Sequence, residues 1–270
     1  IGGGVLMANT RQTLFNLHTL HIGDEDIPVT SVRSLFADSD RNLWIGVGTY
    51  GLACQEYATG KLKMYSHIPE FSEVPTLPSL VAVMQRKKSG ELWFGFYNGG
   101  IYVYRKGEKV QYLSGENTDF VTSFSVSALY EDWEGNCWVG TRGGLGVKLA
   151  DGTGYRFGRM EFADSLSVDK MYVRDIVRDT DNSIWVATSN LGLIHITTLK
   201  YENYSYRNRK LLTNTVFCLH IDRFSRLWAG TEGGGLYLYN RESKEFEEKN
   251  RKYSIPGDVV LSVEEDKSGG

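Results

Sequence analysis

The chain has 270 residues, 41% of them hydrophobic, and is therefore long enough to bury a large core without disulfides. Its formal net charge of −3 argues against a dedicated nucleic-acid binder, which carries a basic surplus or patch. No run of about 18 apolar residues predicts a membrane span.

One pattern recurs along the chain from its N-terminal third onward. It is read as DSDRNLWIGVGTYGL, KKSGELWFGFYNGGI, DWEGNCWVGTRGGLG, DTDNSIWVATSNLGL and DRFSRLWAGTEGGGL. The tryptophans of these five stretches, at positions 44, 93, 138, 185 and 228, are 49, 45, 47 and 43 residues apart. Such a period, rich in aromatic and β-branched residues with glycine turns, is typical of propeller blades.

The repeat extends upstream of each tryptophan. An apolar residue lies twelve positions before it, another nine before, and an Asp six before, as in Val32, Leu35 and Asp38. The repeat around Trp93 has Lys87 at the Asp position. Val260, Val263 and Asp266 restart the pattern, and Ile1-Gly2 matches the residues that follow a tryptophan, so we count six units.

Each unit predicts four short strands. For the second unit these are Val32–Ala37, Leu43–Val47, Leu52–Tyr57 and Lys61–Tyr65, with Asp38 accepting backbone N–H groups across the first turn. The predicted fold is an all-β propeller of four-stranded blades, either a closed six-bladed ring or part of a seven-bladed one. The blades are expected at 1–22 with 258–270, 30–68, 78–113, 122–157, 170–206 and 214–249.

The recurring glycines separate two interpretations of the chain. Gly143-Gly144 recurs as Gly99-Gly100 and as Gly233 with Gly235, always between the second and third strands. A phosphate-binding loop needs glycines that open a helix, and no helix-length amphipathic segment follows any of them. We therefore interpret them as turn residues, tolerant of positive φ.

The two ends of the chain lead to an expectation about ring closure. Val259–Asp266 is predicted as the innermost strand of a blade whose outer strands come from residues 1–22. The chain opens IGGGVLMANT, with no basic region before an apolar core and no initiator Met, so no signal peptide is visible. We expect a segment of something longer.

The pattern V-x-x-L-x-x-D-x-x-G-x-L-W-I-G-T, followed by a Gly-Leu pair and a hairpin, resembles the two-component regulator propeller repeat. Ala187, Val47 and Phe96 depart from it after the tryptophan. The resemblance implies the periplasmic sensor region of a hybrid histidine kinase, an oligosaccharide ligand, and neighbouring propeller and immunoglobulin-like domains. It also implies a homodimeric receptor with its kinase elsewhere.

Catalytic and metal-binding patterns are missing from the sequence. The five histidines show no H-x-x-x-H or H-x-H spacing, and Asp38, Asp40 and Asn42 mimic only the start of a calcium loop. No G-x-S-x-G or Cys-His frame is present, although glycosidase-like carboxylate pairs stay open. The three cysteines form no CxxC pair and are expected to be buried thiols. We expect no enzyme, no metal and no cofactor in this segment.

Residues that differ between repeats are expected to carry the binding site, because a uniform scaffold presents function on its loops. The loops between second and third strands share one face with the connectors between blades. Tyrosine can stack on a sugar, and Asn, Arg and Glu can pair with hydroxyls or carboxylates. The candidate residues at these tips are Tyr50, Tyr97, Asn98, Arg142, Asn190 and Glu232. The connectors Ser66–Pro78 and Gly158–Asp169 are expected to fold over the same face.

The function predicted from the sequence is a sensor propeller that binds an oligosaccharide or docks neighbouring sensor domains, without turnover. It is expected to contact neither nucleic acid nor membrane. Two alternatives stay open: a carbohydrate-active enzyme on a propeller scaffold, and a propeller that only binds proteins.

Overall fold

The computed structural model describes residues 5–9, 12–18, 32–74, 76–157, 171–197, 201–250, 255 and 257–265. These residues form strands and turns with only three short 3-10 helices, so the all-β prediction is confirmed. The chain divides into two compact units. Unit 1 comprises residues 1–117 and 124–126, and unit 2 comprises residues 118–123 and 127–270.

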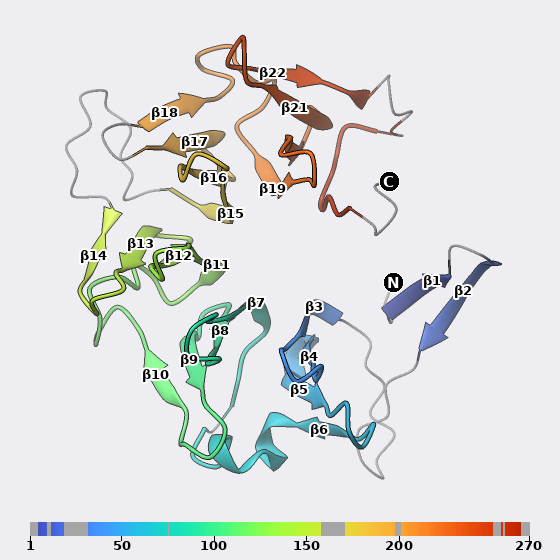
Figure 1. Ribbon diagram of the computed structural model, residues 1–270, viewed down its shortest axis with the longest axis vertical. Helices are drawn as coiled ribbons and strands as arrows, with labels where there is room; N and C mark the ends of the chain where they lie inside the picture. The colour runs from blue at the N-terminus through green and yellow to red at the C-terminus, as the bar shows by residue number, and fades with distance from the viewer. Residues whose placement is uncertain are drawn as a thin grey trace. The chain divides into compact units, whose positions relative to one another are not determined.

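Unit 1 contains one hairpin and two four-stranded sheets, coloured blue to green in Figure 1. The hairpin pairs β1 (Val5–Asn9) with β2 (Gln12–His18). The first sheet consists of β3 (Val32–Ala37), β4 (Leu43–Val47), β5 (Gly51–Gln55) and β6 (Leu62–Met64). The second consists of β7 (Leu80–Gln85), β8 (Leu92–Phe96), β9 (Gly100–Tyr104) and β10 (Gln111–Leu113). The 3-10 helices are η1 (Gly48–Tyr50), η2 (Tyr65–His67) and η3 (Pro69–Phe71).

Unit 2 contains three four-stranded sheets, coloured green to red in Figure 1. The first consists of β11 (Val126–Glu131), β12 (Cys137–Thr141), β13 (Gly144–Lys148) and β14 (Gly154–Arg156). The second consists of β15 (Val173–Arg178), β16 (Ile184–Thr188), β17 (Leu193–Ile196) and β18 (Tyr201–Tyr204). The third consists of β19 (Val216–Ile221), β20 (Leu227–Thr231), β21 (Leu236–Asn240) and β22 (Glu245–Glu248). All neighbouring strands pair antiparallel in chain order, as the four-strand repeat predicts.

The second strand of each sheet lies deepest in the core. β8, β12, β16 and β20 are buried at every position, because both faces of the strand are covered. In β16 the side chains alternate between two clusters: Ile184 and Val186 pack with the preceding sheet, and Trp185 packs with the following one. This double burial explains why the alternation of polar and apolar residues fails in these strands.

The glycine two positions after the tryptophan marks the close approach of the next blade segment. A Cβ on Gly46 would lie 3.0 Å from the carbonyl oxygen of Leu80, and one on Gly230 would lie 2.8 Å from that of Val260. A Cβ on Gly140 would overlap the side chain of Val173. The W-x-G element of the repeat is therefore a packing requirement between successive sheets.

The connector Ser66–Pro78 is placed differently from the prediction. It buries Ile68, Phe71 and Leu77 in the core of unit 1, and only its end, Leu77 and Pro78, packs against the tip glycines Gly51 and Gly99. Phe71 stacks on Tyr104 with ring centroids 5.8 Å apart. Three apolar side chains in the connector make burial between the two sheets more favourable than a course over a polar face. The other connector, Gly158–Asp169, lies outside the described residues.

The segment Val259–Asp266 does not form the predicted strand within its described part, residues 259–265. Val259 makes an isolated bridge with Glu232, and the amide of Val260 donates to Thr231 at 2.9 Å. The Asp258 carbonyl accepts from Gly233 and Gly235, so the segment meets the third sheet of unit 2 at its loop end. The blade limits, the ring closure and the number of blades stay predictions.

Candidate functional site

The repeated Asp and Trp form a clamp that holds each blade together. The indole N–H of Trp44, Trp138 and Trp228 donates at 2.9 Å to the Asp six residues earlier, and that of Trp185 donates to Asp179 at 3.0 Å. The same carboxylates accept backbone amides across the turn, as predicted for Asp38, whose Oδ1 accepts from Asn42 N at 2.8 Å. The six-residue spacing is therefore structural, because a buried indole N–H needs an acceptor.

In the repeat around Trp93, a different residue accepts from the indole N–H. Lys87 takes the Asp position, and the indole N–H of Trp93 donates instead to Glu91, two residues before it, at 2.8 Å. Glu91 is buried and also accepts from Arg105 at 2.6 and 2.9 Å. Burial opposes ionisation of Glu91, but the bonds from Trp93 and Arg105 outweigh it and lower the pKa of the carboxyl. This sheet therefore keeps a carboxylate acceptor for its tryptophan, supplied two residues before the Trp instead of six.

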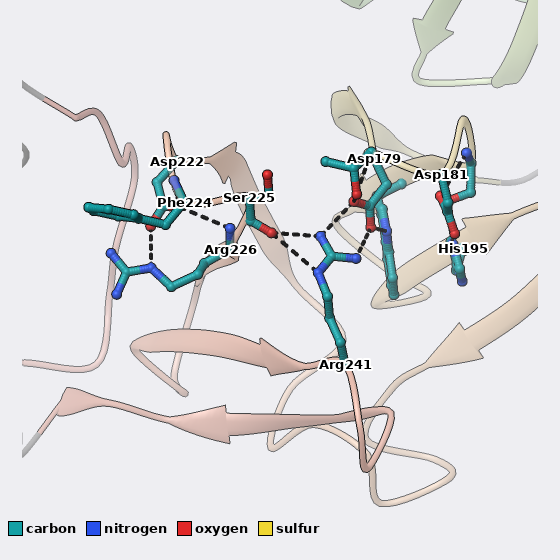
Figure 2. A network of polar contacts seen from close by, with 11 residues as sticks. Asp179, Asp181, His195, Asp222, Phe224, Ser225, Arg226 and Arg241 are labelled. Atoms are coloured by element: carbon teal, nitrogen blue, oxygen red, sulfur yellow. Dashed lines mark hydrogen bonds and ion pairs between the residues drawn. The ribbon is translucent and has the colours of Figure 1, made fainter.

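Asp179 anchors a larger network between two sheets of unit 2 (Figure 2). Arg241, at the hairpin between β21 and β22, donates from both terminal nitrogens to the Asp179 carboxylate at 2.6 and 2.9 Å. It also donates to the carbonyl oxygen of Ser225 at 2.7 Å. Burial raises the pKa of Asp179, yet the bonds from Arg241, Thr180 and Trp185 prevail and leave it below its usual value. These groups stabilise the scaffold.

A Ser, a His and an Asp also meet in unit 2, but in an order that does not activate a nucleophile. The His195 ring lies 4.0 Å from the Trp185 ring and contacts Ser183 Oγ through Nε2 at 2.7 Å. Ser183 Oγ in turn donates to Asp181 at 2.5 Å. In a catalytic triad the imidazole lies between the hydroxyl and the carboxylate. Here the buried hydroxyl lies between them, and burial lowers the pKa of His195.

A threonine fixes the shape of each loop tip in unit 2. Thr141 Oγ1 accepts from Gly143 N at 3.0 Å, and Thr188 Oγ1 accepts from Leu191 N at 2.9 Å. Thr188 and Thr231 also donate to the carbonyl at the end of their loops, each at 2.8 Å. Hence the Thr that ends W-x-G-T braces the loop, which positions the variable residue that follows it.

The structure brings two predicted residues of unit 2 together around one that sequence reasoning missed. Tyr172, just before β15, donates its amide to the Asn190 side-chain oxygen at 3.0 Å. The Arg142 guanidinium lies 5.6 Å from the Tyr172 ring centroid. The backbone of the third predicted residue, Glu232, is held by Thr215, whose carbonyl accepts from Glu232 N at 3.1 Å. A Tyr placed thirteen residues before the repeat tryptophan was the available signal.

The predicted tip residues of unit 1 are held by contacts different from those in unit 2. Asn98 has φ of 56° and contacts Ser125 both through its amide nitrogen, at 3.3 Å, and through its side-chain oxygen. Tyr97 and Tyr50 have exposed side chains, and the Tyr97 amide donates to Ser79 O at 2.9 Å. Val47 and Phe96 stand where unit 2 has the bracing threonine. The tips of unit 1 are shaped instead by η1 and by Gly100, whose φ is 67°.

Unit 1 also contains a groove that sequence analysis did not predict. It has a volume of about 740 Å³ and lies at the hairpin end of the sheets, between the β3–β4 turn and the β7–β8 turn. Ile68, Leu92 and Tyr104 contribute apolar surface, and Asp40 and Glu70 contribute carboxylates. Burial, followed by nearby carboxylates, raises the pKa of Tyr104 to about 12.

The three thiols are buried, and the described residues contain no cluster of metal-ligating side chains. No group of three or more His, Cys, Asp or Glu side chains there is arranged to hold a metal ion. All three cysteines are buried and free, and burial raises the pKa of Cys54 to about 12 and that of Cys218 to about 11. No helix among the described residues is long and apolar enough to cross a membrane.

Comparison with known proteins agrees with the repeat pattern. The sequence model of the two-component regulator propeller matches residues 26–49 and 167–190. A histidine kinase of Formosa agariphila, named Histidine kinase P4, is 33% identical over 89 residues. That match covers 31% of this chain and 6% of the kinase.

Two solved structures share the fold. The extracellular domain of a hybrid two-component system from B. thetaiotaomicron superposes with a TM-score of 0.76 and 21% identity, over 99% of this chain and 34% of that one. PorZ, a surface component of the type-IX secretion system of Porphyromonas gingivalis, gives a TM-score of 0.66 and 20% identity, over 88% of this chain and 36% of PorZ. The chain thus spans about a third of these structures.

The four-stranded sheets, their Trp clamps and this structural likeness define a β-propeller protein. The chain carries repeats of the two-component regulator propeller family.

Proposed function

We propose that this chain is a sensor propeller of a hybrid two-component histidine kinase, located in the periplasm, which binds an oligosaccharide and does not cleave it. The observation that carries the proposal is the contrast between a uniform scaffold and its variable loop tips. Trp recurs in all five four-stranded sheets, with its Asp in four of them, whereas Arg142, Tyr172 and Asn190 belong to no repeated element and form one cluster. Such contrast is typical of a site grafted on a rigid framework.

The chemistry of this cluster fits a sugar better than an apolar ligand. Tyr172 is exposed and presents a ring on which a sugar face can stack, while Arg142 and Asn190 supply donors for hydroxyl groups. Kinship with a histidine kinase and with the extracellular part of a hybrid two-component system supports a signalling role. Neighbouring sensor domains and a second copy of the receptor are the partners that such a role requires.

Isothermal titration calorimetry of the chain against a panel of oligosaccharides tests the proposal. The expected result is saturable heat with one sugar class and unchanged oligosaccharide length after incubation, measured by chromatography. Sustained heat with shortened products would favour a carbohydrate-active enzyme instead. Absence of heat with every sugar would contradict oligosaccharide binding and favour a propeller that only contacts proteins.

A further inference from the structure

The loop-tip face of unit 2 carries a continuous row of side chains from three successive sheets. We call it the arginine face and define it by Arg142, Tyr172, Arg174, Ser189, Asn190 and Phe217. Arg142 follows β12, Tyr172 and Arg174 lie at the start of β15, Ser189 and Asn190 follow β16, and Phe217 lies in β19.

The first half of the arginine face is a cation stacked on an exposed ring. Tyr172 is 43% exposed, and the guanidinium carbon of Arg142 lies 5.6 Å from its ring centroid. Because the side-chain oxygen of Asn190 accepts the Tyr172 amide, its NH₂ group is oriented away from that bond. The position thus combines an aromatic platform, a guanidinium and an amide donor.

The second half is built around Arg174. Its Nε donates to Ser189 Oγ, and its guanidinium carbon lies 5.6 Å from the Phe217 ring centroid. One edge of the guanidinium is therefore held by the protein, while its two terminal nitrogens form no hydrogen bond or ion pair with another described residue. A guanidinium fixed at Nε presents a preformed pair of donors to a planar or tetrahedral anion.

The six residues of this face include two arginines, and none of the six carries a carboxylate. Glu232, the acidic tip of the same unit, follows β20, and its backbone amide donates to the carbonyl oxygen of Thr215. An uncharged ligand would use the hydrogen bonds of the face but not the positive charge of Arg174. An anionic ligand would use both.

The geometry points to an anionic oligosaccharide, bearing a uronate carboxylate or a sulfate ester, as the ligand class of this site. This inference rests on the proposed sensor function and narrows it. The sugar ring stacks beside Tyr172, and its anionic group pairs with the terminal nitrogens of Arg174. Rim charges of this kind are screened by salt, so affinity is expected to fall as ionic strength rises.

Calorimetry with three probes of equal length separates the possibilities: an oligogalacturonide, a neutral galacto-oligosaccharide and a sulfated galactan oligosaccharide. We expect saturable binding of the uronate or the sulfated probe and none of the neutral one. Arg174→Gln should weaken that binding about tenfold, as expected for loss of a hydrogen bond to a charged group. Arg174→Lys, which keeps the charge but not the fork, should weaken it less.

Lys244→Gln is the matched control, because it removes one positive charge at the β21–β22 hairpin, at the other end of the sheet. It should leave affinity unchanged, and circular dichroism should show all variants folded. Equal binding of the neutral and anionic probes, with no effect of Arg174→Gln, would overturn the anionic class and leave the sensor proposal standing. No binding of any of the three probes would overturn the anionic class, and the wider panel of oligosaccharides then decides the sensor proposal.

Discussion

The clamp between Asp179, Trp185 and Arg241 makes a direct prediction about stability. Substituting Asp179 with Ala removes the acceptor of the Trp185 indole N–H, at 3.0 Å, and of two Arg241 nitrogens, at 2.6 and 2.9 Å. Trp185 is fully buried, so its indole N–H loses its acceptor inside the core. The Asp179 side chain is 2% exposed and that of Arg241 is 40% exposed.

The expected loss follows from these two contributions. An unsatisfied buried donor such as the Trp185 N–H costs about 1–3 kcal/mol. The ion pair adds roughly 1 kcal/mol rather than the value for a fully buried pair, because solvent reaches Arg241. The free energy of unfolding should therefore fall by about 2–4 kcal/mol in Asp179→Ala. Asp179→Asn keeps an acceptor for Trp185 and should lose about half as much.

Urea unfolding followed by tryptophan fluorescence measures both losses as shifts of the midpoint. Asp151→Ala is the matched control, because Asp151 is exposed and bonds only within its own turn. It should change the free energy of unfolding by no more than about 0.5 kcal/mol. An Asp179→Ala protein with the stability of this control would refute the clamp as a stabilising element.

Three further substitutions and conditions test the same account of the scaffold. Ser225 has φ of 60°, so Ser225→Gly should stabilise the chain by about 0.5–1 kcal/mol, the relief of left-handed strain less the entropy of Gly, in the same urea assay. Lys244→Gly, also at positive φ, provides the comparison, and a destabilised Ser225→Gly protein would contradict the strain argument. Gly140→Ala places a Cβ against Val173 and should lower the free energy of unfolding by about 1–3 kcal/mol. Gly152→Ala is the control: its Cβ would meet no atom, so it should lose only the smaller free energy of placing Ala at a φ of 94°. Acidification should lower stability: the pKa values of Asp179, Asp222 and Glu91 are lowered in the folded chain, so their contribution is present above their ordinary values near pH 4 and is lost as pH falls through the lowered ones. The lowered pKa of His195 also makes the folded chain less stable as pH falls below 6.5, whereas the raised pKa of Asp175 makes it more stable on acidification. Thermal unfolding between pH 3 and 7 measures the sum, and a melting temperature that did not fall with pH would contradict this balance.

Much of the blade could be predicted from the repeat. The first two strands of the second unit, Val32–Ala37 and Leu43–Val47, have the predicted bounds. The third strand ends earlier than predicted, at Gln55, because the turn begins at Glu56, whose amide donates to Lys61 O and whose carbonyl accepts from Gly60. Turn residues compete locally for the backbone groups that a strand would use, and alternation alone does not reveal this.

Side-chain partners were harder to predict than strands. The sequence predicts that Asp38 accepts backbone amides across its turn. It does not predict that Asp38 also accepts from the Trp44 indole, although the constant six-residue spacing was a signal for this contact. The sequence shows that Lys87 departs from the pattern, but not that the Glu91 carboxylate, just before β8, accepts from the Trp93 indole in place of the missing Asp. A pattern of residue types therefore shows which position lacks the usual Asp, but not which nearby residue accepts the indole hydrogen bond instead.

The candidate site shows the same limit. Arg142 and Asn190 were selected because they vary at loop tips, and the structure joins them through Tyr172. Tyr172 and Arg174 lie at the entry of the next blade segment, where the sequence suggested only a connector and an inner strand. Their proximity to Arg142 arises from the stacking of successive sheets, which the repeat spacing does not encode residue by residue.

Hydrogen–deuterium exchange with and without a binding oligosaccharide tests the central claim most directly, namely that the loop-tip face holds the ligand. We expect slower exchange at the amides of residues 141–144, 172–174 and 188–192 when ligand is bound. The hairpin turns at 132–136 and 179–183, at the other end of the same sheets, should be unchanged. Protection confined to those turns, or to the groove beside Tyr104 in unit 1, would contradict it.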